Sequence, residues 1–260
     1  MKNTLVVLFL MITYSFSALS QQQEKLKTTV YDWNKLSVEE TKSGEKKHIL
    51  EGCTNALSYF EIHVTTLKSG KVSPDKFPSS QKEKLIIVKE GRLEQSLNGE
   101  KKVLGRGSVT LVLPGDQLTI KNTGKATASY YLLSWKVDKP INNELAINGG
   151  GSKFYDYNEI EFRKTTKGGT RQFMRRPTAT FSELEMHTTT LNENIASHAE
   201  HVHESEEVIL VIKGEVEESI NDIQYKTGTG SLILLMNNDS HGIRNIGKGE
   251  CEYFAFKWTK

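Results

Sequence analysis

The stretch that decides the fold is His201-Val202-His203-Glu204-Ser205-Glu206-Glu207-Val208-Ile209-Leu210-Val211-Ile212-Lys213-Gly214. Its two histidines stand two residues apart, and on a β-strand such positions point to the same side. Glu207 has the parity of His203, and Gly214 suits the sharp turn of a hairpin. The stretch therefore predicts a β-hairpin whose first strand carries three groups able to bind one metal ion.

A second stretch supplies a fourth ligand from another strand. After Gly230 comes the apolar run 232–236, then the turn 237–240, and then His241, with Asn245 four residues later. Three imidazoles and one carboxylate suit manganese, iron, nickel, cobalt or zinc, whereas calcium and magnesium prefer oxygen ligands alone. The predicted cofactor is one divalent transition metal, held by His201, His203, Glu207 and His241.

The two stretches resemble the two sequence motifs of the cupin family. The first reads His201-x-His203-x3-Glu207-x6-Gly214. The second reads Gly230-x5-Met236-x-Asn238-x2-His241-x3-Asn245, with Met236 and Asn238 where Pro and Gly are usual. The family includes oxalate-degrading enzymes, dioxygenases, sugar isomerases and (S)-ureidoglycine aminohydrolase, a bicupin of similar length to which the layout is distantly similar. The resemblance implies an all-β chain of two tandem cupin-type, jelly-roll-like β-barrels.

An internal repeat divides the chain. Tyr31-Asp32 recurs as Tyr155-Asp156, a shift of 155 − 31 = 124, and His63 to Leu67 matches His187 to Leu191 at the same shift. With one residue dropped after Leu191, the later part repeats at a shift of 123. The repeat predicts an N-terminal cupin at 28–136, a linker at 137–151 and a C-terminal metal-binding cupin at 152–260.

The first unit lacks the ligand set. Subtracting 123 from the four ligand positions places Pro78, Ser80, Lys84 and Leu118 there, and together these cannot hold a divalent ion. We therefore expect a structural first barrel, and we expect that a change at Ser80 leaves metal content unaltered.

Strand burial follows from the hydrophobic pattern. Phe60, Ile62 and Val64 alternate with Glu61 and His63, which predicts a strand with one buried face. Leu232 to Leu235 is apolar throughout and predicts a strand that is covered on both sides.

Residues 1–20 have the pattern of a secretory signal peptide, with Lys2, an apolar run and a small-residue ending. The alternative is a membrane anchor, but the run from Leu5 to Ile12 is shorter than the ~20 residues that span a bilayer. We expect an exported protein, periplasmic or secreted, without membrane contact after cleavage. The formal net charge of +2 gives no reason to expect nucleic acid as a partner. A small-molecule ligand is the expected partner, and exposed sheet edges could also pair as a homo-oligomer.

Other polar residues carry weaker signals. We interpret His187 as structural, His198 as a pocket-rim or solvated residue, and His48 as a surface residue. We expect Cys53 and Cys251 to be separate buried thiols. Three arginines could form a rim for an anionic substrate, but solvation is the favoured interpretation: Arg171, Arg175 and Arg176. Strand parity directs Arg244 away from the site. Three carboxylates could act as general acid or base, and the spacing selects none of them: Glu200, Glu204 and Glu206.

Four protein ligands leave about two positions on an ion that prefers six, which is the arrangement of a catalytic site. The leading hypothesis is a metal-dependent enzyme that acts on a small oxygen-rich metabolite: a hydroxy or keto acid, a sugar acid or a ureide. The alternative is an exported, non-catalytic cupin that binds a metabolite or sugar. A metal-free storage or scaffold protein is a third reading, which the intact ligand set disfavours.

Overall fold

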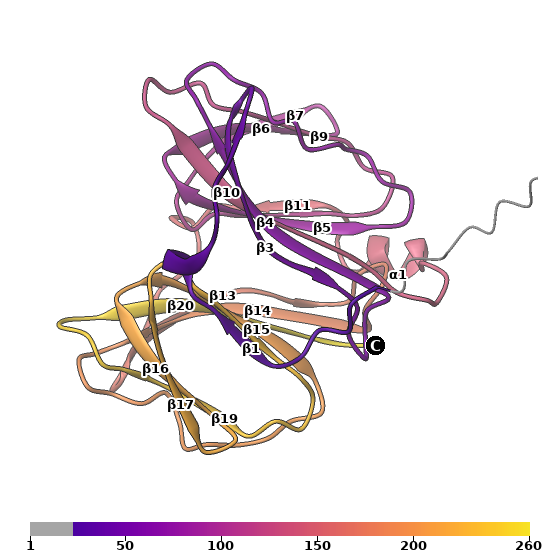
Figure 1. Ribbon diagram of the computed structural model, residues 1–260. Coiled ribbons are helices and arrows are strands. Elements are labelled where there is room, and N and C mark those ends of the chain that lie inside the picture. The colour runs from indigo at the N-terminus through magenta and orange to yellow at the C-terminus, as the bar shows by residue number, and fades with distance from the viewer. Residues whose placement is uncertain (1–22) are drawn as a thin grey trace, which may run out of the picture.

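The computed structural model describes residues 23–260, so the predicted signal peptide at 1–20 lies outside the described residues. The described chain forms two adjacent β-barrels (Figure 1). Its only helices are a 3-10 turn, η1 (Trp33–Lys35), and α1 (Asn143–Asn148), which lies within the predicted linker. None of the helices in this part of the chain is long and apolar enough to cross a membrane.

Most strands of the first barrel come from the first half of the chain. They are β2 (Glu39–Thr41), β3 (Gly44–Gly52), β4 (Tyr59–Leu67), β5 (Glu83–Glu90), β6 (Arg92–Leu97), β7 (Glu100–Gly105), β8 (Val109–Val112), β9 (Leu118–Lys121), β10 (Ala128–Lys136) and β11 (Lys153–Tyr155). A seven-stranded sheet has the order β11-β8-β5-β10-β4-β3-β2, and a three-stranded sheet has the order β7-β6-β9.

The second barrel has the same plan. Its strands are β1 (Thr29–Tyr31), β12 (Arg163–Thr165), β13 (Gly168–Arg176), β14 (Glu183–Leu191), β15 (Glu206–Lys213), β16 (Glu215–Ile220), β17 (Ile223–Gly228), β18 (Leu232–Leu235), β19 (His241–Asn245) and β20 (Cys251–Thr259). The sheet orders are β1-β18-β15-β20-β14-β13-β12 and β17-β16-β19. The predicted all-β class with two tandem barrels is confirmed.

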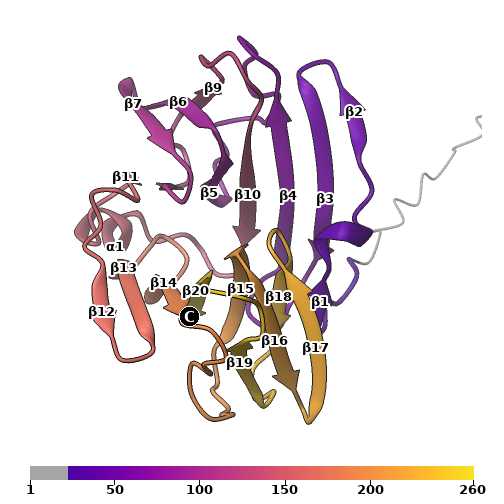
Figure 2. The ribbon, with the colours of Figure 1, turned by 90° about the vertical axis from the view of Figure 1, so that its left-hand side faces the viewer.

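The two barrels exchange their first strands. β1 comes first in the chain, yet it pairs antiparallel with β18 of the second barrel, and β11 pairs with β8 of the first. Figure 2 shows β1 beside the second barrel and β11 beside the first. The unit boundaries predicted at 28 and 152 follow the sequence repeat, which records likeness between segments and not the sheet that each segment joins. The exchange therefore ties each half of the chain to the other.

An aromatic ring after each exchanged strand lies on a glycine of the other barrel. A Cβ atom at Gly230 would lie 2.7 Å from Cγ of Trp33, and one at Gly107 would lie 2.5 Å from Cδ2 of Tyr157. Both glycines also have a positive φ, +97° and +80°. Because side chains avoid both conditions, only glycine suits these two contacts.

Gly230→Ala is expected to lower the free energy of unfolding by about 2–4 kcal/mol, because it adds a clash with Trp33 to the backbone strain. Urea denaturation followed by circular dichroism measures the loss. Gly249→Ala is the matched control, since Gly249 has a φ of +75° with no atom within 4 Å of the added Cβ. Equal losses in the two variants would show that the contact with Trp33 contributes nothing.

The largest apolar core lies between the two seven-stranded sheets. Leu232 and Leu234 of β18 point into this interface, while Ile233 and Leu235 point into the second barrel. The prediction that this strand is covered on both sides is thus confirmed. The same interface stacks the Trp135 ring on Phe181, with centroids 5.6 Å apart. Strands with two apolar faces are expected where a sheet is covered on both sides.

The prediction of one buried face for β4 is wrong. Ile62 and Val64 do face the inter-barrel core, but His63 on the opposite face is only 3% exposed. That face is turned into the first barrel and not toward solvent. The alternation of apolar and polar residues here separates an apolar interface from a polar interior.

Two buried carboxylates connect the barrels reciprocally. Glu83 of β5 accepts hydrogen bonds from Nε1 of Trp135, from the hydroxyls of Thr178 and Thr180, and from the backbone N–H of Ala179. In the opposite direction, Glu206 of β15 accepts two hydrogen bonds, from the Thr54 hydroxyl and the Ala56 backbone N–H. Each carboxylate therefore holds a loop of the other barrel, and Glu83 has the larger number of partners.

Both cysteines are free, as expected. Cys251 is buried, and burial raises the pKa of its thiol to about 11. Cys53 is partly exposed, so the prediction of two buried thiols is correct only for Cys251.

Candidate metal centre

The structure brings together the four side chains predicted as ligands, inside the second barrel. Glu207 lies on β15, and His241 is the first residue of β19. His201 and His203 lie in the loop before β15, so their predicted placement on a strand is wrong. One bridge anchors this loop, in which the backbones of His201 and His241 exchange hydrogen bonds of 3.1 and 3.0 Å. The bridge positions His201, while the backbone carbonyl of His203 accepts a hydrogen bond of 2.9 Å from the N–H of Asn238, so strand alternation does not bring the two imidazoles together.

The three histidines have the donor spacing that one ion needs, and Glu207 lies beside two of them, His203 and His241. One ring nitrogen from each of His201, His203 and His241 lies within 4.8 Å of the others. Oε2 of Glu207 is 3.0 Å from Nε2 of His203 and 3.4 Å from Nε2 of His241. Ligands that each lie ~2.0–2.2 Å from a shared ion are separated by about this much.

Backbone carbonyls orient two of the three rings. Nδ1 of His203 is 2.8 Å from the carbonyl oxygen of Ser205, and Nδ1 of His241 is 2.9 Å from that of Asp239. A ring that donates its Nδ1–H to a carbonyl offers an unprotonated Nε2 to a metal. Nε2 of His241 is buried and has no hydrogen-bond partner in the described chain. This orphaned nitrogen fits a metal ligand.

The charges of the cluster also suit a cation. Burial opposes ionisation of Glu207, but the hydrogen bond from His203 and the nearby charge of His241 prevail and lower its pKa to about 2. Burial, together with the neighbouring His198 and His241, lowers the pKa of His201. Glu207 is therefore ionised and His201 neutral at pH 7, as metal ligands must be, whereas Glu207 outweighs burial and raises the pKa of His241, so a cation would displace a proton there.

A cavity of about 270 Å³ adjoins the cluster. Besides the four residues above, its polar lining comprises His187, Thr189, Ser197, His198, Glu218, Tyr253 and Lys257. Pockets for drug-sized ligands span roughly 300–1,000 Å³. The cavity thus has the size and polarity for a small metabolite.

Of the other histidines, His198 and His48 lie where the sequence predicts. His198 lines the cavity from the exposed loop, with its ring edge-on to His201 and centroids 4.2 Å apart. His187 lies in the cavity wall, outside the histidine cluster. His48 is exposed.

The charged candidates do not reach the cavity. Arg171 instead lies over the rings of Tyr157 and Phe162, at 4.2 and 4.6 Å from their centroids. Arg244 is exposed and is 4.0 Å from Glu217, as its strand parity predicts. The remaining candidates are also absent from the cavity lining: Arg175, Arg176, Glu200, Glu204 and Glu206.

The sequence interpretation missed Glu218. It lies on β16 between Val216 and Ile220, and all three side chains are buried. Neither carboxyl oxygen has a hydrogen-bond partner among residues 23–260, and burial raises the pKa to about 8. The detectable signal was a glutamate in phase with two apolar residues of one strand.

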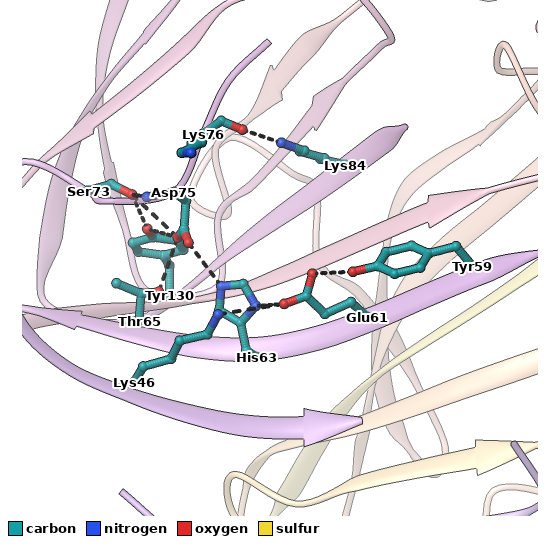
Figure 3. Close-up of polar contacts among 10 residues, drawn as sticks. All are labelled: Lys46, Tyr59, Glu61, His63, Thr65, Ser73, Asp75, Lys76, Lys84 and Tyr130. Atoms are coloured by element: carbon teal, nitrogen blue, oxygen red, sulfur yellow. Dashed lines mark hydrogen bonds and ion pairs between the residues drawn. The ribbon is translucent and has the colours of Figure 1, made fainter. Parts of the chain in front are cut away.

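In the first barrel, a network of side chains fills the corresponding region (Figure 3). His63, the counterpart of His187, lies between two carboxylates, with Nδ1 2.8 Å from Glu61 and Nε2 3.2 Å from Asp75. The hydroxyls of Thr65 and Tyr130 also donate to Asp75. Internal ion pairs thus take the place of the open cavity.

The structure corrects the alignment of the two units. The hydrogen bond from Gly115 N to Ser79 O repeats that from Asn238 N to His203 O, so Ser79, and not Ser80, is the counterpart of His203. The dropped residue therefore lies between 203 and 206, at the end of the predicted loop after Leu191, so the shift of 123 does not apply at 201 and 203. At the same shift of 124, Phe77 corresponds to His201, and it packs against the core of the first barrel. Lys84, where the second barrel has Glu207, donates to the carbonyl of Lys76.

The ion pairs of His63 predict a pH-dependent stability. Burial disfavours the imidazolium, but Asp75 and Glu61 prevail and raise the pKa of His63, while the pKa of Glu61 falls to about 2. The raised pKa stabilises the fold fully below ~6.5, and this contribution is lost as the pH rises through the folded pKa. The contribution of Glu61 is present above ~4.5 and is lost as the pH falls toward 2.

We expect His63→Leu to lower the free energy of unfolding by about 2–4 kcal/mol at pH 5.5, because it leaves two part-buried carboxylates without their partner. The loss should be smaller at pH 8.5. Urea denaturation at both pH values tests this expectation. His187→Leu is the control with the opposite sign, because burial lowers the pKa of His187. A cost for His63→Leu that grows with pH would contradict the assignment.

Comparisons with known proteins agree with this architecture. Residues 188–257 match the model of the cupin domain. No curated protein matches the sequence. The fold is similar to that of protein YlbA from E. coli, with a TM-score of 0.68, 16% identity, and 95% of this chain and 97% of that chain covered. The fold is also similar to that of a putative glyoxylate induced protein from Pseudomonas aeruginosa, with a TM-score of 0.66, 15% identity, and 85% of this chain and 84% of that chain covered. A deletion mutant of oxalate decarboxylase from Bacillus subtilis matches with a TM-score of 0.65, 11% identity, and 90% of this chain and 78% of that chain covered.

Two tandem barrels, with a histidine cluster inside the second, give the chain a bicupin-like architecture. The second barrel contains a match to the cupin domain over residues 188–257, and the whole chain has a fold similar to those of YlbA and oxalate decarboxylase. At these identities the solved structures speak for the fold alone. The likeness to (S)-ureidoglycine aminohydrolase stays a prediction.

Proposed function

We propose that the protein binds one divalent transition metal through His201, His203, Glu207 and His241, and that it is a metal-dependent enzyme for a small oxygen-rich metabolite. The observation that carries this proposal is the buried, unpartnered Nε2 of His241, which faces the Glu207 carboxylate beside an open cavity. The mixed nitrogen and oxygen set suits manganese, iron, nickel, cobalt or zinc.

The residues of the chain prepare the site in three ways. The imidazoles lower the pKa of Glu207, so its carboxylate is ionised before a cation arrives. The carbonyls of Ser205 and Asp239 fix two rings with Nε2 inward. The cavity wall supplies hydroxyl groups and the Lys257 ammonium, which can orient an anionic ligand. A bound metal would supply Lewis acidity toward a carbonyl, a carboxylate or a water molecule.

The names of two structural neighbours suggest where to begin. One neighbour acts on oxalate, and another is described as glyoxylate induced. Both compounds are two-carbon acids that would fit a cavity of about 270 Å³. The candidate substrates are therefore small hydroxy and keto acids first, followed by sugar acids and ureides.

Two measurements test the proposal. Elemental analysis of the purified protein is expected to find about one equivalent of transition metal. The loaded protein is then incubated with the acids above, and consumption is followed by NMR. Turnover supports the enzyme, whereas thermal stabilisation by a compound that is never consumed identifies a non-catalytic binding protein. Protein that takes up no metal, even after incubation with manganese, iron or zinc, would refute the site.

We also propose export, which rests on the sequence of residues 1–20. Fractionation of expressing cells, with sequencing of the mature amino terminus, tests this assignment. Full-length protein that stays in the cytoplasm would contradict it.

A further inference from the structure

Glu218 lies on the same inner face of the small sheet as His241. In the pairing of β16 with β19, Ile220 is opposite His241 and Glu218 is opposite Ile243. Two residues along a strand return to the same face, so the carboxyl of Glu218 lies in the wall of the cavity, two residues along the sheet from the position opposite His241. It belongs to neither the cluster nor the surface, since Glu218 is 0% exposed.

The first barrel shows a partly satisfied polar group at this position. Its counterpart, Gln95 (218 − 123 = 95), is equally buried; its Oε1 accepts a hydrogen bond of 2.8 Å from the Thr110 hydroxyl, whereas its Nε2 has no partner among the described residues. The counterpart of Thr110 in the second barrel is Ile233 (110 + 123 = 233), an apolar residue with no hydrogen to donate. The second barrel therefore has a more polar group at this position and lacks the partner.

Such an arrangement is costly for the protein alone. A buried carboxyl without hydrogen bonds loses its hydration and gains nothing in return. Buried polar groups without partners are rare, and a bound molecule is one way to satisfy them. The cavity beside Glu218 has room for such a molecule, and Ile209, Ile243 and Ala255 give it apolar sides between the two polar ends.

We propose that Glu218 is a substrate-binding residue. Its carboxyl group forms a hydrogen bond with the end of the bound molecule that points away from the predicted metal-binding histidines. The ligand class is then a short carboxylate with a hydroxyl or amide group at its far end. The carboxylate lies toward the cation, the carbon chain passes Ile209 and Ile243, and the distal group pairs with Glu218. This inference rests on the proposed function, because it assumes that the metal site binds the carboxylate of the ligand.

Matched pairs of acids test the inference by isothermal titration calorimetry on zinc-loaded protein, since zinc has no redox chemistry. The pairs are 3-hydroxypropionate with butyrate, 4-hydroxybutyrate with valerate, and 5-hydroxyvalerate with hexanoate. In each pair a hydroxyl replaces a methyl group of similar size. Wild-type protein is expected to bind at least one hydroxy acid about tenfold more tightly than its partner, as befits one hydrogen bond to a buried polar group. Glu218→Met is expected to abolish or reverse that preference.

A second readout needs no ligand. Because Glu218→Met removes an unpartnered carboxyl, the metal-free variant is expected to melt about 5 °C above wild type. Gln95→Met, the matched control, loses the bond with Thr110 and is expected to melt below wild type with its ligand preference intact. If Glu218→Met fails to fold, Glu218→Gln serves in its place, with a preference reduced about threefold or more.

The outcomes separate this inference from the proposed function. Equal zinc binding by wild type and Glu218→Met, with loss of the hydroxyl preference in the variant, supports the inference. An unchanged preference in either Glu218 variant, or no preference in wild type for any pair, overturns it while leaving the metal site intact. Failure of wild type to bind metal overturns the proposed function itself, and this result is visible before any acid is added.

Discussion

His203→Ala is expected to reduce bound transition metal from about one equivalent to about a tenth or less after dialysis, while the protein stays folded. The variant loses one of four donors and frees Glu207 from its 3.0 Å contact, so the remaining set binds a cation weakly. The fold should persist because the first barrel forms the same strands with Ser79 at this position. Elemental analysis and circular dichroism on the same sample measure both results.

Two serines of the first barrel provide the control. Ser79→Ala changes the structural counterpart of His203, and a change at Ser80 tests the neighbouring position. Both variants are expected to keep the metal content of wild type. A His203→Ala variant that retains its metal would remove this side chain from the ligand set, and a variant that unfolds would show that the site is structural.

Glu83→Ala is expected to lower the free energy of unfolding by about 3–5 kcal/mol, because several buried donors lose their acceptor at about 1–3 kcal/mol each. The change leaves Trp135 Nε1, the hydroxyls of Thr178 and Thr180, and the N–H of Ala179 without their acceptor. These groups belong to both barrels, so the loss acts on the interface between them. Urea denaturation followed by tryptophan fluorescence measures it.

Glu206→Ala is the matched control for this prediction. Glu206 occupies the equivalent place in the second barrel but accepts only from Thr54 and Ala56, so a smaller loss is expected. Glu83→Gln should fall between wild type and alanine, because an amide keeps one acceptor. A loss below about 1 kcal/mol for Glu83→Ala would mean that water replaces the carboxylate without cost.

The local pattern of residue types was enough to predict the β class and the four side chains that converge in the second barrel. Strand spacing, turn residues and ligand types act over short distances in the chain, so a motif keeps its meaning without coordinates. Asn238 illustrates this point: it stands where glycine is usual and adopts a φ of +68°, a conformation that asparagine tolerates. Its counterpart Gly115 has a φ of +92°.

Other features were beyond the pattern because they depend on pairing between distant segments. The repeat could not show that β1 joins β18, since the sheet that a strand joins is set by backbone hydrogen bonds between remote residues. Strand alternation gave His63 a solvent-facing side, because it cannot tell the inside of a polar barrel from its outside. The position of the dropped residue became visible only because the backbone carbonyls of Ser79 and His203 accept equivalent hydrogen bonds in the two barrels.

By itself, therefore, the sequence determined the two-barrel class and the chemical types of the candidate ligands. Only the tertiary structure decided which buried polar groups lack partners, among them Nε2 of His241 and both oxygens of Glu218. The physical reason is that satisfaction of a buried group depends on every atom that surrounds it, and those atoms come from strands far apart in the chain. One example is the hydrogen bond from Thr110 to Gln95 in the first barrel. The second barrel cannot form it, because Ile233 stands at the position that matches Thr110.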